Sequence, residues 1–132
     1  MINKNVLTLA YMGDSVYENY VRKYLIEQGI EKVNNLQKQA VTLVSAKAQA
    51  SFLKKLMDNE FLTETELSVV YRARNYKQRR HPKHTDIVTY KHSTAFEALI
   101  GYLYLTENFD RLEEIWGEIK CIYVEKTSLE NI

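Results

Sequence analysis

The sequence predicts an all-α protein with a single domain of five to seven helices, and three observations support this class. Apolar side chains recur at three- and four-residue spacing along most of the chain. Residues that break helices are few, with 4 Gly and 1 Pro among 132 residues. Helix-capping signatures punctuate the apolar segments. A chain of this length is expected to be one domain, here residues 1–132, with enough residues to bury a core.

The first two helices are predicted over residues 3–28 and 35–43. Apolar side chains follow one stripe of the first helix through Val6, Leu9, Ala10, Gly13, Tyr17, Val21, Tyr24 and Leu25. Gly29 is suited to the left-handed conformation that ends a helix. Asn34 is the expected N-cap of the second helix.

The third helix is predicted over residues 46–59, capped by Ser45 and rich in Ala, Lys, Gln and Leu, which favour helix. Thr63 and Glu66 have the spacing of a capping box, which begins a fourth helix that runs to about Arg74. In this box the threonine side chain and the glutamate side chain each satisfy a free backbone N–H.

The fifth helix is predicted over residues 92–107. Asp110 and Glu113 have the spacing of a second capping box, which predicts a sixth helix ending near Lys126. Residues 75–91, between the fourth and fifth helices, contain the only proline (Pro82) and have no amphipathic period, so they are predicted to form a loop. A loop of this length inside a small domain is usually functional.

The charge of the chain is concentrated around this loop. The whole chain has a formal net charge of +1, but residues 72–92 carry seven basic residues against Asp86 alone, a net charge of +6, which leaves −5 for the rest. All three histidines (His81, His84 and His92) lie in the same segment. Such a segment is a predicted docking site for a polyanion. The basic residues are Arg72, Arg74, Lys77, Arg79, Arg80, Lys83 and Lys91.

The sequence and its composition exclude several classes of protein. No apolar run approaches the roughly 20 residues of a membrane-spanning helix. Asp14 and Glu18 interrupt the N-terminal segment before a signal peptide could end, so secretion is not expected. Cys121 is the only cysteine, so neither a disulfide framework nor a cysteine zinc site is available. The expected location is the cytoplasm.

Two acids lie on helix faces that otherwise look buried. Asp14 shares the apolar stripe of the first helix, and Glu97 lies in the apolar segment AFEALIGYLYL. Gly13 and Gly101 would let the two helices approach and bring the carboxylates together. Paired carboxylates suit Mg²⁺ or Mn²⁺, and such a site beside a basic loop is typical of phosphodiester hydrolysis. Two structural alternatives stay open, in which Asp14 pairs with a core arginine or Glu97 faces solvent.

Two segments of the chain resemble those of a known protein family. LAYMGDSVYE (residues 9–18) is similar to the signature helix of the ribonuclease III family, and STAFEALIGYLYL (residues 93–105) is similar to its second acidic helix. The order of elements and the motifs HSTAFEALIGY and VSAKAQA resemble most closely the Mini-ribonuclease III group, whose members lack a double-stranded-RNA-binding domain. The resemblance covers essentially the whole chain.

The resemblance implies a Mg²⁺-dependent endoribonuclease, with Mn²⁺ as a substitute, that cleaves double-stranded RNA. Asp14 and Glu97 match two catalytic, metal-binding acids of the family. Two further acids of the general ribonuclease III pattern are replaced by Ala10 and Thr94, which leaves the number of cations open. The resemblance further implies a homodimer in which Tyr11 packs on the partner, although on the sequence alone Tyr11 could equally belong to the core.

Precursor 23S ribosomal RNA is the substrate that the resemblance implies, with a large-subunit ribosomal protein as a further partner. The basic loop would then replace the absent RNA-binding domain. Glu18 and Lys47 are weaker candidates, for a base near the site and for a phosphate contact. Two other functions stay open. One is a non-catalytic RNA-binding or ribosome-assembly module of the same fold, and the other is a helical phosphohydrolase acting on nucleotides.

Overall fold

The computed structural model describes residues 5–77 and 86–130, and this part of the chain contains six helices and no strand. The prediction of an all-α fold with five to seven helices is therefore confirmed. No helix within the described ranges is both long and apolar enough to cross a membrane. The helices are α1 (Val6–Glu27), α2 (Val33–Val44), α3 (Ala46–Asp58), α4 (Glu64–Arg74), α5 (Ile87–Leu105) and α6 (Phe109–Glu130).

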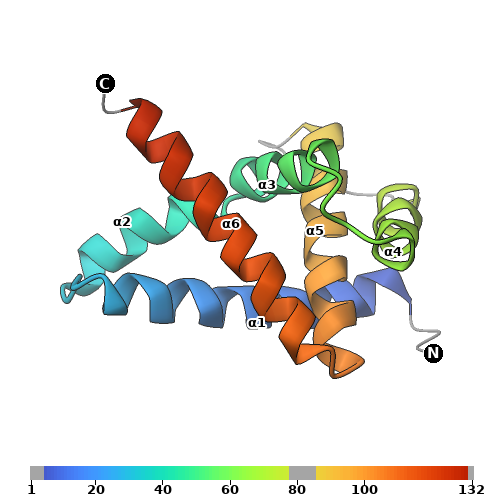
Figure 1. The fold of residues 1–132 in the computed structure, drawn as a ribbon, viewed down its shortest axis with the longest axis horizontal. Coiled ribbons are helices and arrows are strands. Elements are labelled where there is room, and N and C mark those ends of the chain that lie inside the picture. Colours follow the sequence, from blue (N-terminus) through green and yellow to red (C-terminus); the bar gives the residue numbers. More distant parts are fainter. Residues whose placement is uncertain (1–4, 78–85, 131–132) are drawn as a thin grey trace.

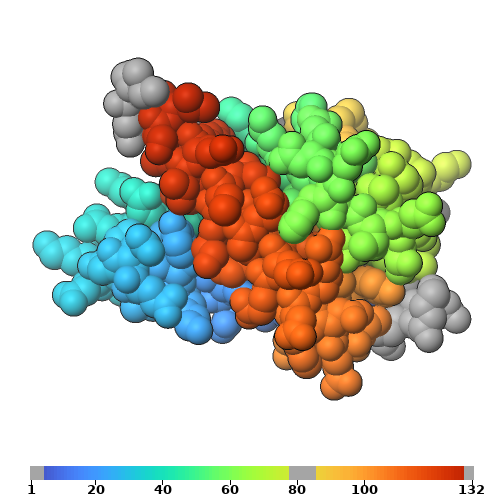
Figure 2. Space-filling model, viewed as in Figure 1, coloured from blue at the N-terminus to red at the C-terminus, as the bar shows by residue number. Residues whose placement is uncertain are grey.

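Helix α5 is at the centre of the arrangement (Figure 1). It crosses α1 steeply and packs against α1, α3 and α4, while α2 packs against α1. Of its 19 residues, ten are buried, as expected for a helix that has neighbours on several sides. Helix α6 runs obliquely over the face seen in Figures 1 and 2, and its Trp116 packs against Tyr17 of α1 in the core.

The crossing of α1 and α5 depends on two glycines. A Cβ atom on Gly13 would lie 1.7 Å from the carbonyl oxygen of Glu97, and one on Gly101 would lie 1.8 Å from the carbonyl oxygen of Leu9. Real Cβ atoms never approach backbone so closely, so any side chain at either position would force the helices apart. The predicted close approach of these helices is confirmed, and it fixes the backbone of Glu97 against α1.

Most of the predicted helix boundaries hold, because their capping groups are in place. The Ser45 and Thr63 side chains accept the N–H groups of Ala48 and Glu66, and the Glu66 side chain accepts the Thr63 N–H. Gly29 has a φ of +93°, and the Ile30 N–H bonds to the Leu25 carbonyl, as in a Schellman ending.

Helix α1 begins at Val6 rather than at residue 3, because the Asn5 side chain accepts the Leu7 N–H as an N-cap. Three other predicted helix starts were also wrong. Helix α2 begins at Val33 with Lys32 as its N-cap, so Asn34 lies inside the first turn. Helix α6 begins at Phe109, which places Asp110 and Glu113 within the helix, and the Glu113 carboxylate instead accepts the Tyr20 hydroxyl.

The third correction concerns the basic loop. Helix α5 begins at Ile87 rather than at residue 92, because the Asp86 side chain accepts the N–H of Thr89 as an N-cap. The predicted loop over residues 75–91 therefore ends earlier, and Lys91 belongs to the helix. Ile87 and Val88 are exposed. This first turn therefore lacks the one-sided apolar pattern from which helices are predicted.

One buried ion pair connects α6 to α4. The Glu66 carboxylate is buried and accepts Nε and Nη2 of Arg111 at 2.8 and 2.9 Å, while Nη2 also donates to the Phe61 carbonyl. Burial raises the pKa of Glu66, but Arg111 and the hydrogen bonds with Thr63 together outweigh it and hold that pKa below its ordinary value. The buried acid with an arginine partner is thus Glu66, not Asp14, and the first structural alternative for Asp14 is wrong.

Candidate active site

The crossing of α1 and α5 brings Asp14 and Glu97 together. Asp14 follows Gly13 on α1, and the Glu97 carbonyl packs against Gly13 itself, so the two side chains leave their helices at the same crossing. Their carboxyl groups are close enough that Asp14 contributes to raising the pKa of Glu97. Asp14 is exposed and Glu97 is half-buried, so the prediction of two buried acids was too strong. Asp14 lies at the edge of the apolar stripe, next to Gly13, rather than within it.

This proximity is electrostatically unfavourable. Burial, followed by the neighbouring Asp14, raises the pKa of Glu97 to about 8, and the charge of Glu18 adds to the effect. The ion pairs within residues 5–77 and 86–130 involve neither Asp14 nor Glu97. Because two adjacent carboxylates without a basic partner repel each other, the crossing favours a proton or a cation between them.

The raised pKa gives a testable pH dependence. Glu97 has a pKa of about 8 in the folded chain against an ordinary value of 4.5, so the folded chain keeps a proton that the unfolded chain has released. This stabilising contribution is complete below pH 4.5 and is lost as the pH rises through 8. Without divalent cations, we expect the free energy of unfolding to fall across this range by on the order of a few kcal/mol.

Urea unfolding in chelator at pH 5 and pH 8.5 measures this loss. Glu97→Gln serves as the control, because it removes the titrating group and leaves the histidines and the other acids in place. The loss should be clearly smaller in Glu97→Gln than in the parent chain. Equal losses in the two proteins would contradict the assignment.

The carboxylate oxygens of Asp14 and Glu97 could supply some of the ligands that a hard divalent cation needs. Carboxylate oxygens are the ligands that Mg²⁺ and Mn²⁺ prefer, and a Mg²⁺ site typically combines one or two carboxylates with water and phosphate. Within the described part of the chain, no group of three or more His, Cys, Asp or Glu side chains is arranged to hold a metal ion. Asp14 and Glu97 could therefore hold one cation whose remaining ligands are not protein groups.

Two other side chains border the pair. Glu18, one turn beyond Asp14, forms an ion pair with Arg22 at 3.0 Å, so a basic group already engages its carboxylate. Gln49 of α3 is buried, and its amide nitrogen lies 3.4 Å from Oε2 of Glu97. Sequence reasoning did not single out Gln49, because nothing in the sequence indicates a contact between residues 48 positions apart.

The basic residues that the structure describes lie near the two ends of the segment that joins α4 to α5 in the sequence. Arg72 and Arg74 are in the last turn of α4, Lys77 follows it, and Lys91 lies in α5. The guanidinium of Arg74 stacks on the Tyr71 ring at 4.8 Å. Lys91 precedes Glu97 by six residues, about 9 Å along the helix axis. Lys47 is exposed on α3.

The other predicted phosphate-binding residues, Arg79, Arg80 and Lys83, lie outside the described residues, as do His81 and His84. His92 is not in a loop, because it lies within α5, where its Nδ1 lies 2.8 Å from the Val88 carbonyl oxygen.

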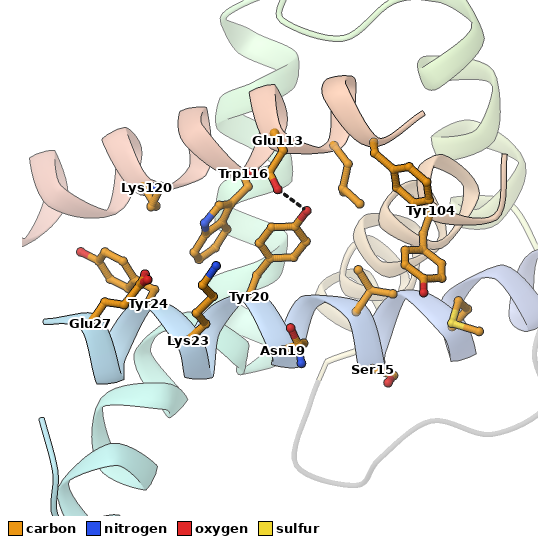
Figure 3. A pocket seen from close by; sticks show the side chains of 14 residues that line it. Ser15, Asn19, Tyr20, Lys23, Tyr24, Glu27, Tyr104, Glu113, Trp116 and Lys120 are labelled. Atoms are coloured by element: carbon orange, nitrogen blue, oxygen red, sulfur yellow. Dashed lines mark hydrogen bonds between the residues drawn. The ribbon is translucent and has the colours of Figure 1, made fainter. Parts of the chain in front are cut away.

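Tyr11 does not belong to the core of the chain. Its side chain is 82% exposed, the largest exposure among the large apolar side chains of the described residues. The core alternative for Tyr11 is therefore wrong. From Met12 onward, side chains of α1 line an open hollow of about 560 Å³ together with side chains of α5 and α6 (Figure 3). Its walls carry the aromatic side chains of Tyr20, Tyr24, Tyr104, Phe109 and Trp116, and the Tyr20–Glu113 hydrogen bond crosses it.

Comparison with known proteins agrees with this arrangement. Residues 7–108 match the family model of the ribonuclease III domain, a span that contains both Asp14 and Glu97. The chain belongs to the ribonuclease III family. Its enzyme class is accordingly that of a ribonuclease III-type endoribonuclease.

Several curated ribonuclease III relatives are similar over most of their length. A Mini-ribonuclease 3 of Brevibacillus brevis is 51% identical over 111 residues, which are 84% of this chain and 81% of that protein. A Mini-ribonuclease 3 of Staphylococcus aureus is 43% identical over 122 residues, which are 92% of this chain and 91% of that protein. A crystal structure of a protein from Fusobacterium nucleatum superimposes with a TM-score of 0.77 at 30% identity, covering 87% of this chain and 92% of that one. The resemblance read from the two acidic helices is thereby confirmed.

Proposed function

We propose that Asp14 and Glu97 are the catalytic acids of this ribonuclease III chain and that together they bind Mg²⁺, with Mn²⁺ as a substitute. The observation that carries this proposal is the contact at Gly13 and Gly101, which sets two carboxylates side by side with no basic partner among the described residues. A protein would not gain stability from such a pair, since the raised pKa of Glu97 reflects repulsion and burial. A functional reason for keeping both acids is therefore favoured.

The chemistry proposed is hydrolysis of phosphodiester bonds in double-stranded RNA. A bound divalent cation activates water and stabilises charge on the phosphate. Asp14 and Glu97 would anchor that cation and hold it at the helix crossing, where the two backbones are in direct contact. With two carboxylates, one cation is the expected occupancy, and any second cation would depend on phosphates of the RNA.

A non-catalytic RNA-binding module is the second candidate, and the residues at positions 10 and 94 favour it. The Ala10 side chain has no ligand atom, and Thr94 has a hydroxyl, which donates to the Tyr90 carbonyl at 3.0 Å, in place of a carboxylate, so neither supplies a negatively charged ligand for a cation. The two candidates are separated by incubating a perfect RNA duplex with the protein in Mg²⁺ or in chelator. Cleavage in Mg²⁺ alone supports the nuclease, and binding without cleavage supports the module. Nucleotide hydrolysis would instead support the phosphohydrolase.

We further propose that the segment from Arg72 to Lys91 binds the RNA backbone. Double-stranded RNA is recognised mainly through its phosphates and 2′-hydroxyl groups, for which flexible basic side chains are suited. The net charge of +6 in residues 72–92, against −5 elsewhere, supports docking of a polyanion at this segment. Precursor 23S ribosomal RNA is the proposed substrate, and a large-subunit ribosomal protein is a further proposed partner, both in the cytoplasm.

Neutralising Arg79, Arg80 and Lys83 together to glutamine should weaken duplex affinity and flatten its salt dependence. Each phosphate contact contributes about 0.9 to the slope of log affinity against log salt, so loss of three should reduce the slope by about 2–3. A salt titration of binding in Ca²⁺ measures the slope, and single-turnover cleavage in Mg²⁺ at saturating RNA should change much less.

The matched control neutralises three exposed lysines elsewhere, Lys32, Lys38 and Lys55, with the same change in net charge. If both triple variants reduce the slope equally, net charge rather than the segment governs binding. A collapse of the saturated rate with an unchanged slope would assign the segment a catalytic role instead.

The proposed assembly is a homodimer formed around α1, as ribonuclease III-type proteins usually dimerise. Tyr11 offers a large apolar side chain to a second copy, and the hollow between α1 and α6 offers an aromatic-lined recess to receive it. In a two-fold interface each copy supplies both parts. Two crossings of Asp14 and Glu97 would then serve the two strands of one duplex.

A further inference from the structure

Gln49 is a buried polar residue with a defined set of contacts. Only 3% of its surface is exposed. Its Nε2 donates to the Val44 carbonyl at 3.2 Å and to Oε2 of Glu97 at 3.4 Å. A side-chain amide nitrogen carries two protons, so these two acceptors account for both of them.

The orientation of the amide follows from its partners. The Val44 carbonyl can only accept a hydrogen bond, and the Glu97 carboxylate also only accepts once it has lost its proton, which is the form that binds a cation. Turning the amide over would place its oxygen against two acceptors. The nitrogen therefore faces Glu97, and because this NH₂ group donates its protons, this end of the amide acts on a bound cation only through Glu97.

The contacts of Gln49 join three helices. Val44 is the last residue of α2, and its carbonyl is one of the four that a helix leaves without a partner at its C-terminus. Gln49 lies in α3, and its side-chain amide donates one proton to this carbonyl. The bond to the backbone of α2 holds the Gln49 side chain in position. The other proton points at the carboxylate of Glu97 on α5, whose backbone is already held against Gly13.

We propose that Gln49 is a positioning residue for Glu97, which keeps the carboxylate beside Asp14 in the orientation that receives the cation. This inference rests on the proposed cation site. Without the amide, the Glu97 carboxylate loses the hydrogen bond that restrains it from α3. Groups that orient metal-binding side chains in this way typically account for 10–100-fold in metal affinity.

Calorimetric titration with Mn²⁺ in the absence of RNA tests the proposal. Gln49→Met keeps the length and volume of the side chain and removes both N–H groups. It should bind Mn²⁺ about 10–100-fold more weakly than the parent chain. Gln39→Met, the same substitution at an exposed position of α2, should bind as the parent chain does. Equal affinity of Gln49→Met and the parent chain would overturn the proposal.

A double-variant cycle distinguishes positioning from a general structural effect. If Gln49 acts through Glu97, adding Gln49→Met to Glu97→Gln should cause no further loss of Mn²⁺ affinity. Losses that multiply would show that Gln49 acts independently of Glu97 and would also overturn the proposal. If Gln49→Met does not fold, Gln49→Asn replaces it, since its amide is one methylene too short to reach both partners. Failure of the parent chain to bind Mn²⁺ would contradict the proposed function itself.

Discussion

Replacing Asp14 by asparagine should lower the rate of Mg²⁺-dependent cleavage of duplex RNA by about a thousandfold or more while the protein stays folded. Asn keeps the shape of the side chain and removes the charge that holds the cation. A bound metal ion contributes several kcal/mol to such reactions, and each 1.4 kcal/mol is about tenfold in rate. Stability should hold or rise, because the substitution relieves the repulsion between Asp14 and Glu97. Single-turnover cleavage and thermal unfolding measure the two effects.

Asp58→Asn is the matched control, because Asp58 is an exposed aspartate that pairs with Lys54 at the far end of α3. It should cleave at the parent rate. Glu97→Gln should lose activity as Asp14→Asn does, with partial recovery at high Mn²⁺, which accepts amide ligands more readily than Mg²⁺. Parent rates in Asp14→Asn, or full activity of Glu97→Gln at low Mg²⁺, would remove these residues from the metal site.

Tyr11→Asp is expected to dissociate the proposed dimer. Tyr11 is 82% exposed in the single chain, and a large aromatic at the centre of an interface typically contributes 2 kcal/mol or more to association. Its loss alone should weaken the dimer by about thirtyfold or more, and two charges facing each other across a two-fold axis should weaken it further. Sedimentation at micromolar concentration should therefore change from dimer to monomer, and folding of the single chain should be unaffected.

Val33→Asp is the control for adding a charge to an exposed apolar position. Val33 is 64% exposed, and it begins α2, where a negative charge near the helix N-terminus is favourable. This variant should remain a dimer. Sedimentation of the parent chain as a monomer would count directly against the proposed assembly.

The sequence could predict the helix crossing because glycine has a physical meaning there. Two glycines on apolar helix faces, each beside an acid, indicate close backbone contact, and the structure places Gly13 and Gly101 in that contact. Capping boxes with the expected partners, as at Thr63 and Glu66, likewise fixed a helix start. Each of these signals is carried by a single residue or by a short spacing. It can therefore be recognised in the sequence before its partner in the fold is known.

What the sequence could not predict depends on partners far along the chain. Helical spacing places Asp14 on the same side as Gly13, but it does not say whether that side ends at the core or at its edge, and Asp14 is exposed. Glu113 has the spacing of a capping box, yet Tyr20 of α1 is its partner. Gln49 looks like an ordinary residue of a polar helix, and only the fold brings it to Glu97.

Anomalous diffraction from a crystal grown with Mn²⁺ and duplex RNA tests the central claim most directly. The claim is that Asp14 and Glu97 together hold the divalent cation at the crossing of α1 and α5. The predicted result is a manganese peak with carboxylate oxygens of both residues as ligands and a phosphate of the RNA nearby. A manganese peak that neither acid contacts, in crystals of a protein that cleaves the duplex, would contradict it.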